Sequence, residues 1–264
     1  MERSEGRHGA DRIDGLVCDL DGVIYRGDEP IPGAIDKVLE LRTDGIDVVF
    51  CTNNSRSTVP QYVAKLTALG LPIEADSIVT SAVVTGEVLS RRGGRRAMVI
   101  GGDGLTAAVT EAGYEIVPPP DRDVDVVVVG WDLDFDFSKL RRAVQAITGG
   151  AAFVASNDDK TFPAPDGVWP GTGALVASIE TATGVSAEVM GKPHEPMMDA
   201  VARRMDGRNR IAIVGDRPDT DLAGGRARGW TTILVLSGVT TESEARSLDP
   251  APDVILGSLA DLVV

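Results

Sequence analysis

The sequence contains few cysteines and few histidines. Its 264 residues include two of each, and both cysteines, Cys18 and Cys51, stand inside apolar segments. Two buried thiols supply neither a disulfide framework nor a zinc site. The composition therefore favours a protein of a reducing compartment, and we expect a cytoplasmic location.

Long apolar runs and basic clusters are also missing. No apolar run approaches the roughly 18 residues of a membrane span, and the polar residues 1–12 are predicted to be a disordered tail and not a signal peptide. The formal net charge is −14, and the densest basic stretch, RRGGRR at residues 91–96, is short and split by glycines. We therefore expect neither a nucleic acid nor a membrane as partner.

Short strands rich in valine and isoleucine alternate with helical patterns along much of the chain. Continuous apolar strands between helices indicate a parallel sheet covered on both faces, which is a Rossmann-like, doubly wound α/β fold. Strands are expected in GLVCDL (residues 15–20), IDVVFCT (46–52), AEVMGK (187–192) and RIAIVGD (210–216).

A second and smaller set of strands and helices begins at about Arg95 and interrupts the first. We predict an inserted α/β domain at residues 84–186. The surrounding core domain is then discontinuous and is made of residues 1–83 and 187–264.

Polar residues follow four apolar strands of the predicted core domain. Ligands of an open parallel sheet bind beyond the carboxyl ends of its strands, so we expect these residues to meet at one site. The four groups are Asp19-Leu20-Asp21-Gly22, Thr52-Asn53-Asn54-Ser55, Gly191-Lys192-Pro193, and residues 215–221 from Gly215 to Asp221.

The acidic members of these groups suit a magnesium ion. Asp19 and Asp216 offer hard oxygen ligands, and the four groups contain no thiol or imidazole, which is the donor set that Mg²⁺ prefers. A cluster that also contained Asp21 and Asp221 would repel itself and any phosphate. Mg²⁺ together with Lys192 would reverse this local field.

Two of the acids are candidates for the chemistry. Asp19 is a plausible nucleophile, because carboxylates form aspartyl-phosphate intermediates. Asp21 stands two residues further on, where it could protonate a leaving alcohol and later accept a proton from water.

Other side chains are candidates for holding the substrate. Hydrogen bonds to phosphate oxygens could come from Thr52 and the amides of Asn53 and Asn54, and Lys192 could bridge the phosphate and Asp19. In the inserted domain, Trp131 and the segment NDDKTFPAP (residues 157–165) could face the substrate. Trp131 could equally be a packing residue at a strand end.

The four segments resemble the motifs of the haloacid dehalogenase (HAD) superfamily of phosphatases. DLDGV, TNNS, GKP and GDRPDTD occur in the order of that superfamily and span nearly the whole chain. DLDGVIYRGDEPIPGA, CTNNS, PGTGAL and VGDRPDTD are similar to the large-cap subclass, which includes para-nitrophenylphosphatase, phosphoglycolate phosphatase, pyridoxal phosphate phosphatase and NagD-type nucleotide phosphatases. That subclass carries an α/β cap between its second and third motifs.

The resemblance implies a function and a set of ligands. Mg²⁺ would be held by Asp19, the backbone carbonyl of Asp21 and Asp216, with Asp221 one step further from the ion. The activity implied is Mg²⁺-dependent hydrolysis of small phosphate monoesters, of the sugar or polyol phosphate, phosphoglycolate or nucleoside monophosphate type. Relatives often dimerise through the cap, so a homodimer is possible.

Two other classes of function remain open from the residues. A phospho-accepting signalling protein also combines acids, a hydroxyl and a lysine at one sheet edge, but it lacks an acid two residues beyond the acceptor. A binding protein without turnover would not need the complete set of charged groups. His194 is a further candidate base, but the chemistry above does not require it, and we interpret it as a loop residue.

Overall fold

The computed structural model describes residues 13–164 and 166–264, so the tail predicted at residues 1–12 and Pro165 lie outside the described residues. The chain divides into two compact units. The first unit contains Met1–Cys51, Leu69–Leu71 and Val201–Val264, and the second unit contains Thr52–Ala68 and Pro72–Ala200.

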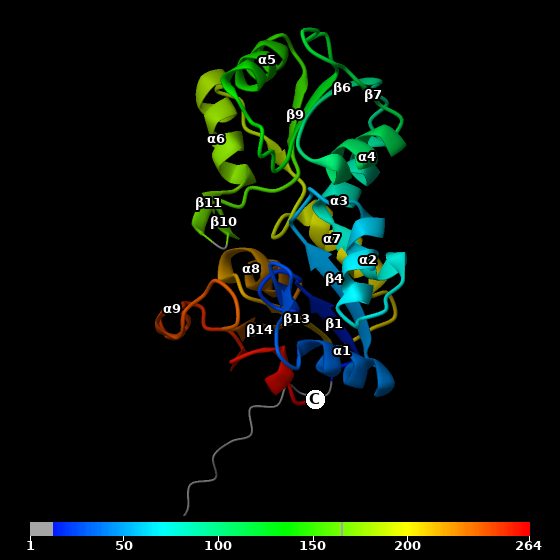
Figure 1. The fold of residues 1–264 in the computed structure, drawn as a ribbon, viewed down its shortest axis with the longest axis vertical. Helices are drawn as coiled ribbons and strands as arrows, with labels where there is room; N and C mark the ends of the chain where they lie inside the picture. Colours follow the sequence, from blue (N-terminus) through cyan, green and yellow to red (C-terminus); the bar gives the residue numbers. More distant parts are fainter. Residues whose placement is uncertain (1–12, 165) are drawn as a thin grey trace, which may run out of the picture. The chain divides into compact units, whose positions relative to one another are not determined.

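The larger sheet has six strands in the order β15-β14-β13-β1-β4-β5 (Figure 1). Neighbouring strands from β15 to β4 pair in parallel. From β1 the chain winds outward to β4 and β5 on one side and to β13, β14 and β15 on the other, which confirms the predicted doubly wound topology. The strands are β1 (Gly15–Cys18), β4 (Asp47–Thr52), β5 (Ile78–Thr80), β13 (Ile211–Gly215), β14 (Thr231–Val235) and β15 (Val254–Leu256).

The strands of the larger sheet are buried almost throughout. All four residues of β1 are buried, as are the last five of β4 and the last four of β13. This is the pattern expected where helices cover both faces of a parallel sheet. The helices outside the smaller sheet are α1 (Ala34–Thr43), α2 (Val59–Ala68), α3 (Ser81–Leu89), α7 (Glu195–Arg204), α8 (Ala223–Ala227) and α9 (Glu242–Arg246).

The smaller sheet is parallel and has the order β12-β9-β8-β6-β7. Its strands are β6 (Arg96–Ile100), β7 (Glu115–Ile116), β8 (Val126–Val129), β9 (Ala152–Ala155) and β12 (Glu188–Val189). Its helices are α4 (Asp103–Glu111), α5 (Phe137–Thr148) and α6 (Thr172–Thr183). None of the helices in the described part of the chain has the length and apolar character needed to cross a membrane.

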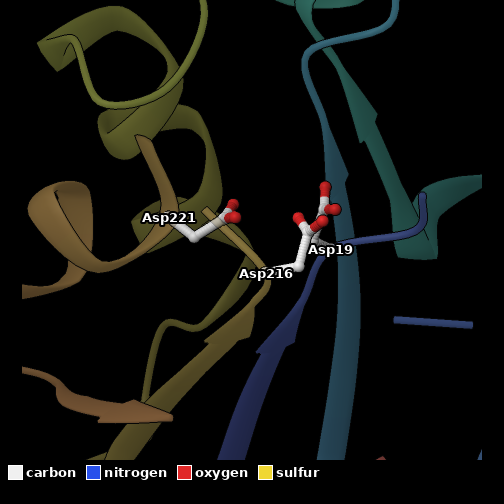
Figure 2. Close-up of side chains that lie close together, drawn as sticks. All are labelled: Asp19, Asp216 and Asp221. Atoms are coloured by element: carbon white, nitrogen blue, oxygen red, sulfur yellow. The ribbon is translucent and has the colours of Figure 1, made fainter. Parts of the chain in front are cut away.

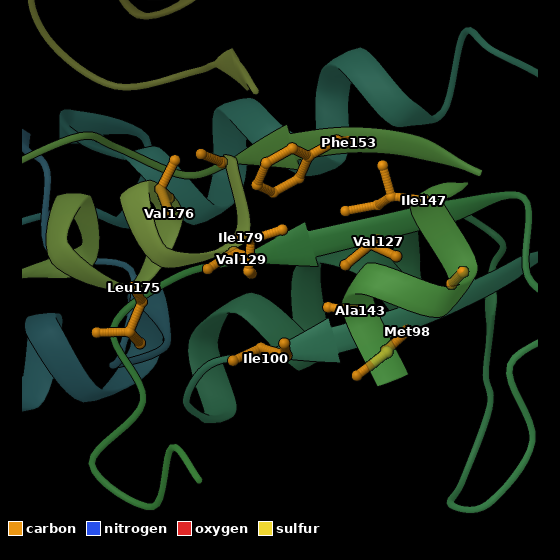
Figure 3. Packing of buried hydrophobic residues seen from close by; sticks show 12 residues of the cluster. Met98, Ile100, Val127, Val129, Ala143, Ile147, Phe153, Leu175, Val176 and Ile179 are labelled. Atoms are coloured by element: carbon orange, nitrogen blue, oxygen red, sulfur yellow. The ribbon is translucent and has the colours of Figure 1, made fainter. Parts of the chain in front are cut away.

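One hydrophobic cluster joins this sheet to α5 and α6 (Figure 3). Met98, Val127 and Phe153 come from the strands, and Ile147 and Ile179 from the two helices. These side chains are 0–5% exposed, so the smaller sheet has a hydrophobic core of its own.

One predicted strand belongs to the other sheet. AEVMGK was expected to continue the larger sheet, but β12 pairs in parallel with β9, through Glu188 opposite Val154 and Val189 opposite Ala155. The strand is two residues long, and Glu188 is exposed, which is typical of an edge strand that needs one partner only. A short apolar run predicts a strand but does not specify the sheet that it joins.

Two antiparallel hairpins were not predicted. They are formed by β2 (Tyr25–Arg26) with β3 (Glu29–Pro30), and by β10 (Thr161–Ala164) with β11 (Gly167–Pro170). Both contain proline, which cannot donate to a strand ladder and therefore argues against a strand assignment.

Candidate active site

Three buried carboxylates lie close together in the first unit (Figure 2). Asp19, Asp216 and Asp221 each present an oxygen within 4.8 Å of the others. Asp19 follows β1 directly and Asp216 follows β13, and these two strands are neighbours, with Cys18 opposite Val214. The strand-end rule therefore brings Asp19 and Asp216 together at one sheet edge.

Asp221 reaches the cluster from a single π-helical turn, η2 (Pro218–Leu222). The exposed fractions of Asp19, Asp216 and Asp221 are 8%, 2% and 1%. In residues 13–164 and 166–264, this is the one group of three or more acidic, histidine or cysteine side chains close enough to share a metal ion.

Backbone and hydroxyl groups fix the orientation of the two acids that follow β13. The backbone N–H of Val239 donates to Oδ2 of Asp216 at 2.7 Å, and the hydroxyl of Thr240 donates to the Asp216 carbonyl at 2.6 Å. The backbone N–H of Arg217 donates to Oδ2 of Asp221 at 3.2 Å. These three hydrogen bonds hold Asp216 and Asp221 in place at the end of β13.

Glycines make room for these carboxylates. A Cβ at Gly215 would stand 2.2 Å from Cγ of Asp221, and a Cβ at Gly238 would stand 1.9 Å from Oδ2 of Asp216. Gly22 has a φ of +85°, and a Cβ there would stand 2.5 Å from the same Oδ2. Side chains at these positions would displace the acids.

The cluster fits a hard divalent cation. Three ionised carboxylates buried this close repel one another, and burying a charge costs several kcal/mol unless it is compensated. All the side-chain donors are oxygens, which suits Mg²⁺ and does not suit metals that prefer sulfur or nitrogen.

Asp21 lies beside the cluster in sequence, but its carboxylate is not a member of it. Asp21 is half-buried and forms a β-bridge with Tyr25, and the backbone N–H of Gly22 donates to the Tyr25 carbonyl at 2.8 Å. The hydroxyl of Ser237 donates to the Gly22 carbonyl at 2.7 Å. The turn that carries Asp21 is thus held by hydrogen bonds on both sides.

The second unit contains the other predicted site residues. Thr52 is the last residue of β4, and its Oγ1 accepts a hydrogen bond from the backbone N–H of Asn54 at 3.1 Å. Oδ1 of Asn54 accepts from the backbone N–H of Arg56 at 3.1 Å. Both contacts are turns of the kind that threonine and asparagine commonly make after a strand.

The structure brings Asn53 and Lys192 together. Oδ1 of Asn53 accepts from the backbone N–H of Lys192 at 2.7 Å, and Nδ2 of Asn53 donates to the Lys192 carbonyl at 3.0 Å. Nδ2 also donates to Oδ1 of Asp159 at 3.0 Å. The contact of Asp159 with Asn53 was not predicted from the sequence. Asp159 stands just after β9, so the strand-end rule applied to the smaller sheet could have drawn attention to it.

Trp131 is a well-packed residue. It is 9% exposed, its indole N–H donates to the Pro170 carbonyl at 3.0 Å, and its ring centroid lies 4.1 Å from that of Phe162. These contacts attach Trp131 to the β10–β11 hairpin. Trp131 also lines a cavity of about 320 Å³, together with Arg56 and Asp132.

His194 makes a contact on the surface. Its Nε2 lies 3.0 Å from Oδ2 of Asp158, and both side chains are more than a third exposed. This partly exposed pair agrees with the interpretation of His194 as a loop residue.

Two family models match the chain. The model for haloacid dehalogenase-like hydrolases matches residues 16–115, and a model for HAD-hydrolase-like proteins matches residues 189–262. The two matches contain all four motifs from which the resemblance was drawn.

Individual relatives match over most of their length. The acid sugar phosphatase of Staphylococcus saprophyticus is 34% identical over 249 residues, which cover 94% of this chain and 95% of the relative. The glycerol phosphate phosphatase from Mycobacterium tuberculosis, in complex with magnesium, has a TM-score of 0.86 and 33% identity, and the match covers 96% of this chain and 77% of that one. NagD from E. coli K-12 has a TM-score of 0.85 and 30% identity, and the match covers 95% of this chain and 98% of NagD.

These similarities confirm the family and the α/β fold predicted from the sequence. Because a relative more than 30% identical is matched over nearly its full length, the family follows without the motifs. The chain belongs to the haloacid dehalogenase superfamily, in its NagD-like subclass, and is a hydrolase that acts on phosphate monoesters.

Proposed function

We propose that this hydrolase is a Mg²⁺-dependent phosphatase of small-molecule phosphate monoesters that uses Asp19 as its nucleophile. The observation that carries the proposal is the cluster of Asp19, Asp216 and Asp221, buried and with oxygens within 4.8 Å of one another. Asp19, Asp216 and the backbone carbonyl of Asp21 would hold Mg²⁺, with Asp221 behind them. When bound, the ion would offset the negative charge of the substrate phosphate.

The first half of the reaction forms a covalent intermediate. A carboxylate oxygen of Asp19 attacks phosphorus, and the bond between phosphorus and the ester oxygen breaks with its electron pair on that oxygen. Asp21 gives its proton to the departing alcohol.

The second half restores the enzyme. Water attacks the phosphorus of the aspartyl phosphate and loses a proton to Asp21. The bond between phosphorus and Asp19 breaks, inorganic phosphate leaves, and Asp19 and Asp21 return to their starting states.

Residues that follow other strands are proposed to hold the phosphate. In this proposal Thr52 and the backbone amides of Asn53 and Asn54 donate hydrogen bonds to phosphate oxygens, and Lys192 adds a positive charge. Lysine suits this role because its ammonium is a compact point charge with three donors.

Sugar or polyol phosphates are the favoured substrates, because the relatives include an acid sugar phosphatase and a glycerol phosphate phosphatase. We assign the choice of ester to the cap at residues 84–186, inserted between core segments 1–83 and 187–264. The cavity beside Trp131 supports this choice, since the guanidinium of Arg56 in its lining could donate hydrogen bonds to substrate hydroxyls.

Two further expectations belong to the same proposal. Cys18 and Cys51 are both buried, which supports a reducing cytoplasm as the location. A homodimer through the cap rests on the family resemblance, and analytical ultracentrifugation would test it.

The experiment is phosphate release from a panel of monoesters with and without Mg²⁺. The panel contains glycerol phosphate, sugar phosphates, phosphoglycolate, nucleoside monophosphates and p-nitrophenyl phosphate. Asp19→Asn should lower the rate by at least about 10³-fold, because it removes a member of a catalytic unit.

Asp219→Asn is the matched control, since Asp219 is an exposed acid two residues before Asp221, and it should retain the wild-type rate. Activity of Asp19→Asn within tenfold of wild type would exclude Asp19 as nucleophile. A wild type that becomes phosphorylated without releasing phosphate would favour a signalling protein.

A further inference from the structure

We infer that Asp159 is a positioning residue, which fixes Lys192 through the side chain of Asn53. All three residues belong to the second unit. The inference rests on the phosphate-binding role proposed for Lys192, and it concerns a carboxylate that contacts Asn53.

The side chain of Asn53 holds both polar groups of the Lys192 backbone. It accepts from the Lys192 N–H at 2.7 Å and donates to the Lys192 carbonyl at 3.0 Å. Asn53 is 6% exposed and Lys192 is 2% exposed, so water has little access to replace these bonds. The main chain at Lys192 is therefore fixed by one amide group.

Asp159 strengthens the orientation of that amide. An asparagine Nδ2 carries two hydrogens, and here one goes to the Lys192 carbonyl and the other to Oδ1 of Asp159. If the amide rotated by half a turn, its oxygen would face the Asp159 carboxylate and the Lys192 carbonyl. Both acceptors would repel it, so the charge on Asp159 adds to the preference for the orientation that holds Lys192.

Asp159 is itself held in place. Its backbone N–H donates to Oδ1 of Asn157 at 3.1 Å, and its carbonyl accepts from the N–H of Gly173 in the first turn of α6 at 2.8 Å. Nδ2 of Asn157 in turn donates to the Asn53 carbonyl at 2.8 Å. The loop after β9 is thus joined to Asn53 at two points.

The network also requires close packing at the residue before Lys192. A Cβ on Gly191 would stand 2.6 Å from Oδ1 of Asn53 and 2.8 Å from the Ser156 carbonyl. The loops that carry Asn53, Ser156 and Lys192 therefore approach each other as closely as their backbones permit.

The consequence for the reaction is the position of a charge. The ammonium of Lys192 is at the end of a four-carbon stem, so a shift of its main chain moves the charge relative to the phosphate. A misplacement of about 1 Å can cost about 10²-fold in rate. Asp159→Ala should therefore lower kcat/KM by displacing the Lys192 ammonium.

The test is a double-mutant cycle of Asp159→Ala and Lys192→Ala, with p-nitrophenyl phosphate as substrate. Asp159→Ala should lower kcat/KM by about 10- to 100-fold in the wild-type background. In the Lys192→Ala background, Asp159→Ala should lower kcat/KM by less than about threefold. The effects of substitutions at residues that act through one another are not additive.

Asp125→Ala is the control for stability. Asp125 accepts from the backbone N–H groups of Arg95 and Arg96 at 2.7 and 2.9 Å, at the start of β6 in the same unit. It should lower the melting temperature and leave kcat/KM unchanged. Asp159→Asn keeps an acceptor oxygen without the charge and should lie between Asp159→Ala and wild type; it replaces Asp159→Ala if that variant does not fold.

Additive losses in the cycle would overturn the inference, as would an equal loss of activity in Asp125→Ala. The affinity of the wild type and of the same variants for orthovanadate, a phosphate analogue, is also measured by calorimetry. A wild type that binds vanadate but hydrolyses no monoester would overturn the proposed function, and the cycle would still decide the role of Asp159. A wild type that does neither would overturn both.

Discussion

The backbone N–H of Val239 lies 2.7 Å from Oδ2 of Asp216, a distance that the absence of a side chain at Gly238 makes possible. Val239 belongs to the loop after β14, whereas Asp216 follows β13 directly. A loop that contributes no side-chain ligand therefore sets the orientation of a proposed metal ligand.

Gly238→Ala should displace the Asp216 carboxylate, because the new Cβ would stand 1.9 Å from Oδ2. We expect a loss of at least about tenfold in kcat/KM and a higher Mg²⁺ requirement. Gly207→Ala is the control: its φ is +81° and its Cβ would meet nothing within 4 Å, so it should cost about 1–2 kcal/mol of stability and no activity. Equal Mg²⁺ dependence in both variants would contradict the proposed role of Asp216.

Asp21→Asn should affect substrates according to their leaving groups. An alkyl alcohol needs a proton as it leaves, whereas nitrophenolate needs much less help. The ratio of the rate on glycerol phosphate to the rate on p-nitrophenyl phosphate should therefore fall in the variant. Equal losses on the two esters would argue against protonation of the leaving group by Asp21.

Removal of divalent ions should abolish turnover. Addition of Mg²⁺ alone should restore it, without any Zn²⁺. Mg²⁺ should also raise the melting temperature, since a ligand at about 100 times its Kd stabilises the folded state by about 2.7 kcal/mol. In Asp216→Asn, Mg²⁺ should raise the melting temperature much less than in wild type. This measurement does not depend on the activity of the variant. Full turnover after exhaustive chelation would defeat the mechanism.

The stability of the first unit should depend on pH through Asp253. The backbone N–H of Thr232 holds the pKa of Asp253 below its usual value of 3.8, with further help from the Thr232 hydroxyl, and both bonds are 2.7 Å long. Because the folded-state pKa is depressed, the stabilisation is present above about pH 4 and is lost as the pH falls through the folded pKa.

Asp253→Asn should therefore have a lower denaturation midpoint than wild type at pH 6, and this difference should shrink at pH 3. Asp249→Asn removes an exposed carboxylate of the same segment and should follow the wild-type curve. A difference between wild type and Asp253→Asn that stays constant with pH would refute the assignment.

The doubly wound parallel fold and part of the site could be predicted, because local patterns reveal a strand and its end. Asp19 and Asp216 were expected together since each follows a buried apolar strand, and β1 and β13 are indeed neighbours. The sheet that β12 joins could not be predicted, because pairing with β9 is a long-range contact that two strand residues do not encode.

The residues that Trp131 and Asp159 contact could not be predicted for the same reason, although the strand-end rule could have pointed to Asp159 itself. The contact of Trp131 with Phe162 depends on the β10–β11 hairpin, and the prolines in that hairpin argue against assigning strands there from the sequence. The contact between Asp159 and Asn53 joins residues 106 positions apart, and no sequence period connects them.

The separation of 106 positions between Asn53 and Asp159 limits how freely the proposed insertion at residues 84–186 can be exchanged. A chimera that takes residues 84–186 from another phosphatase, in the hope of transferring its substrate preference, also imports whatever residue stands opposite Asn53. If that residue is not an acid in the same place, the support for Lys192 is lost along with the original preference. Such chimeras should recover activity when Asp159 and the turn that holds it are restored, because Asn53 and Asp159 belong to one compact unit and must be transferred together.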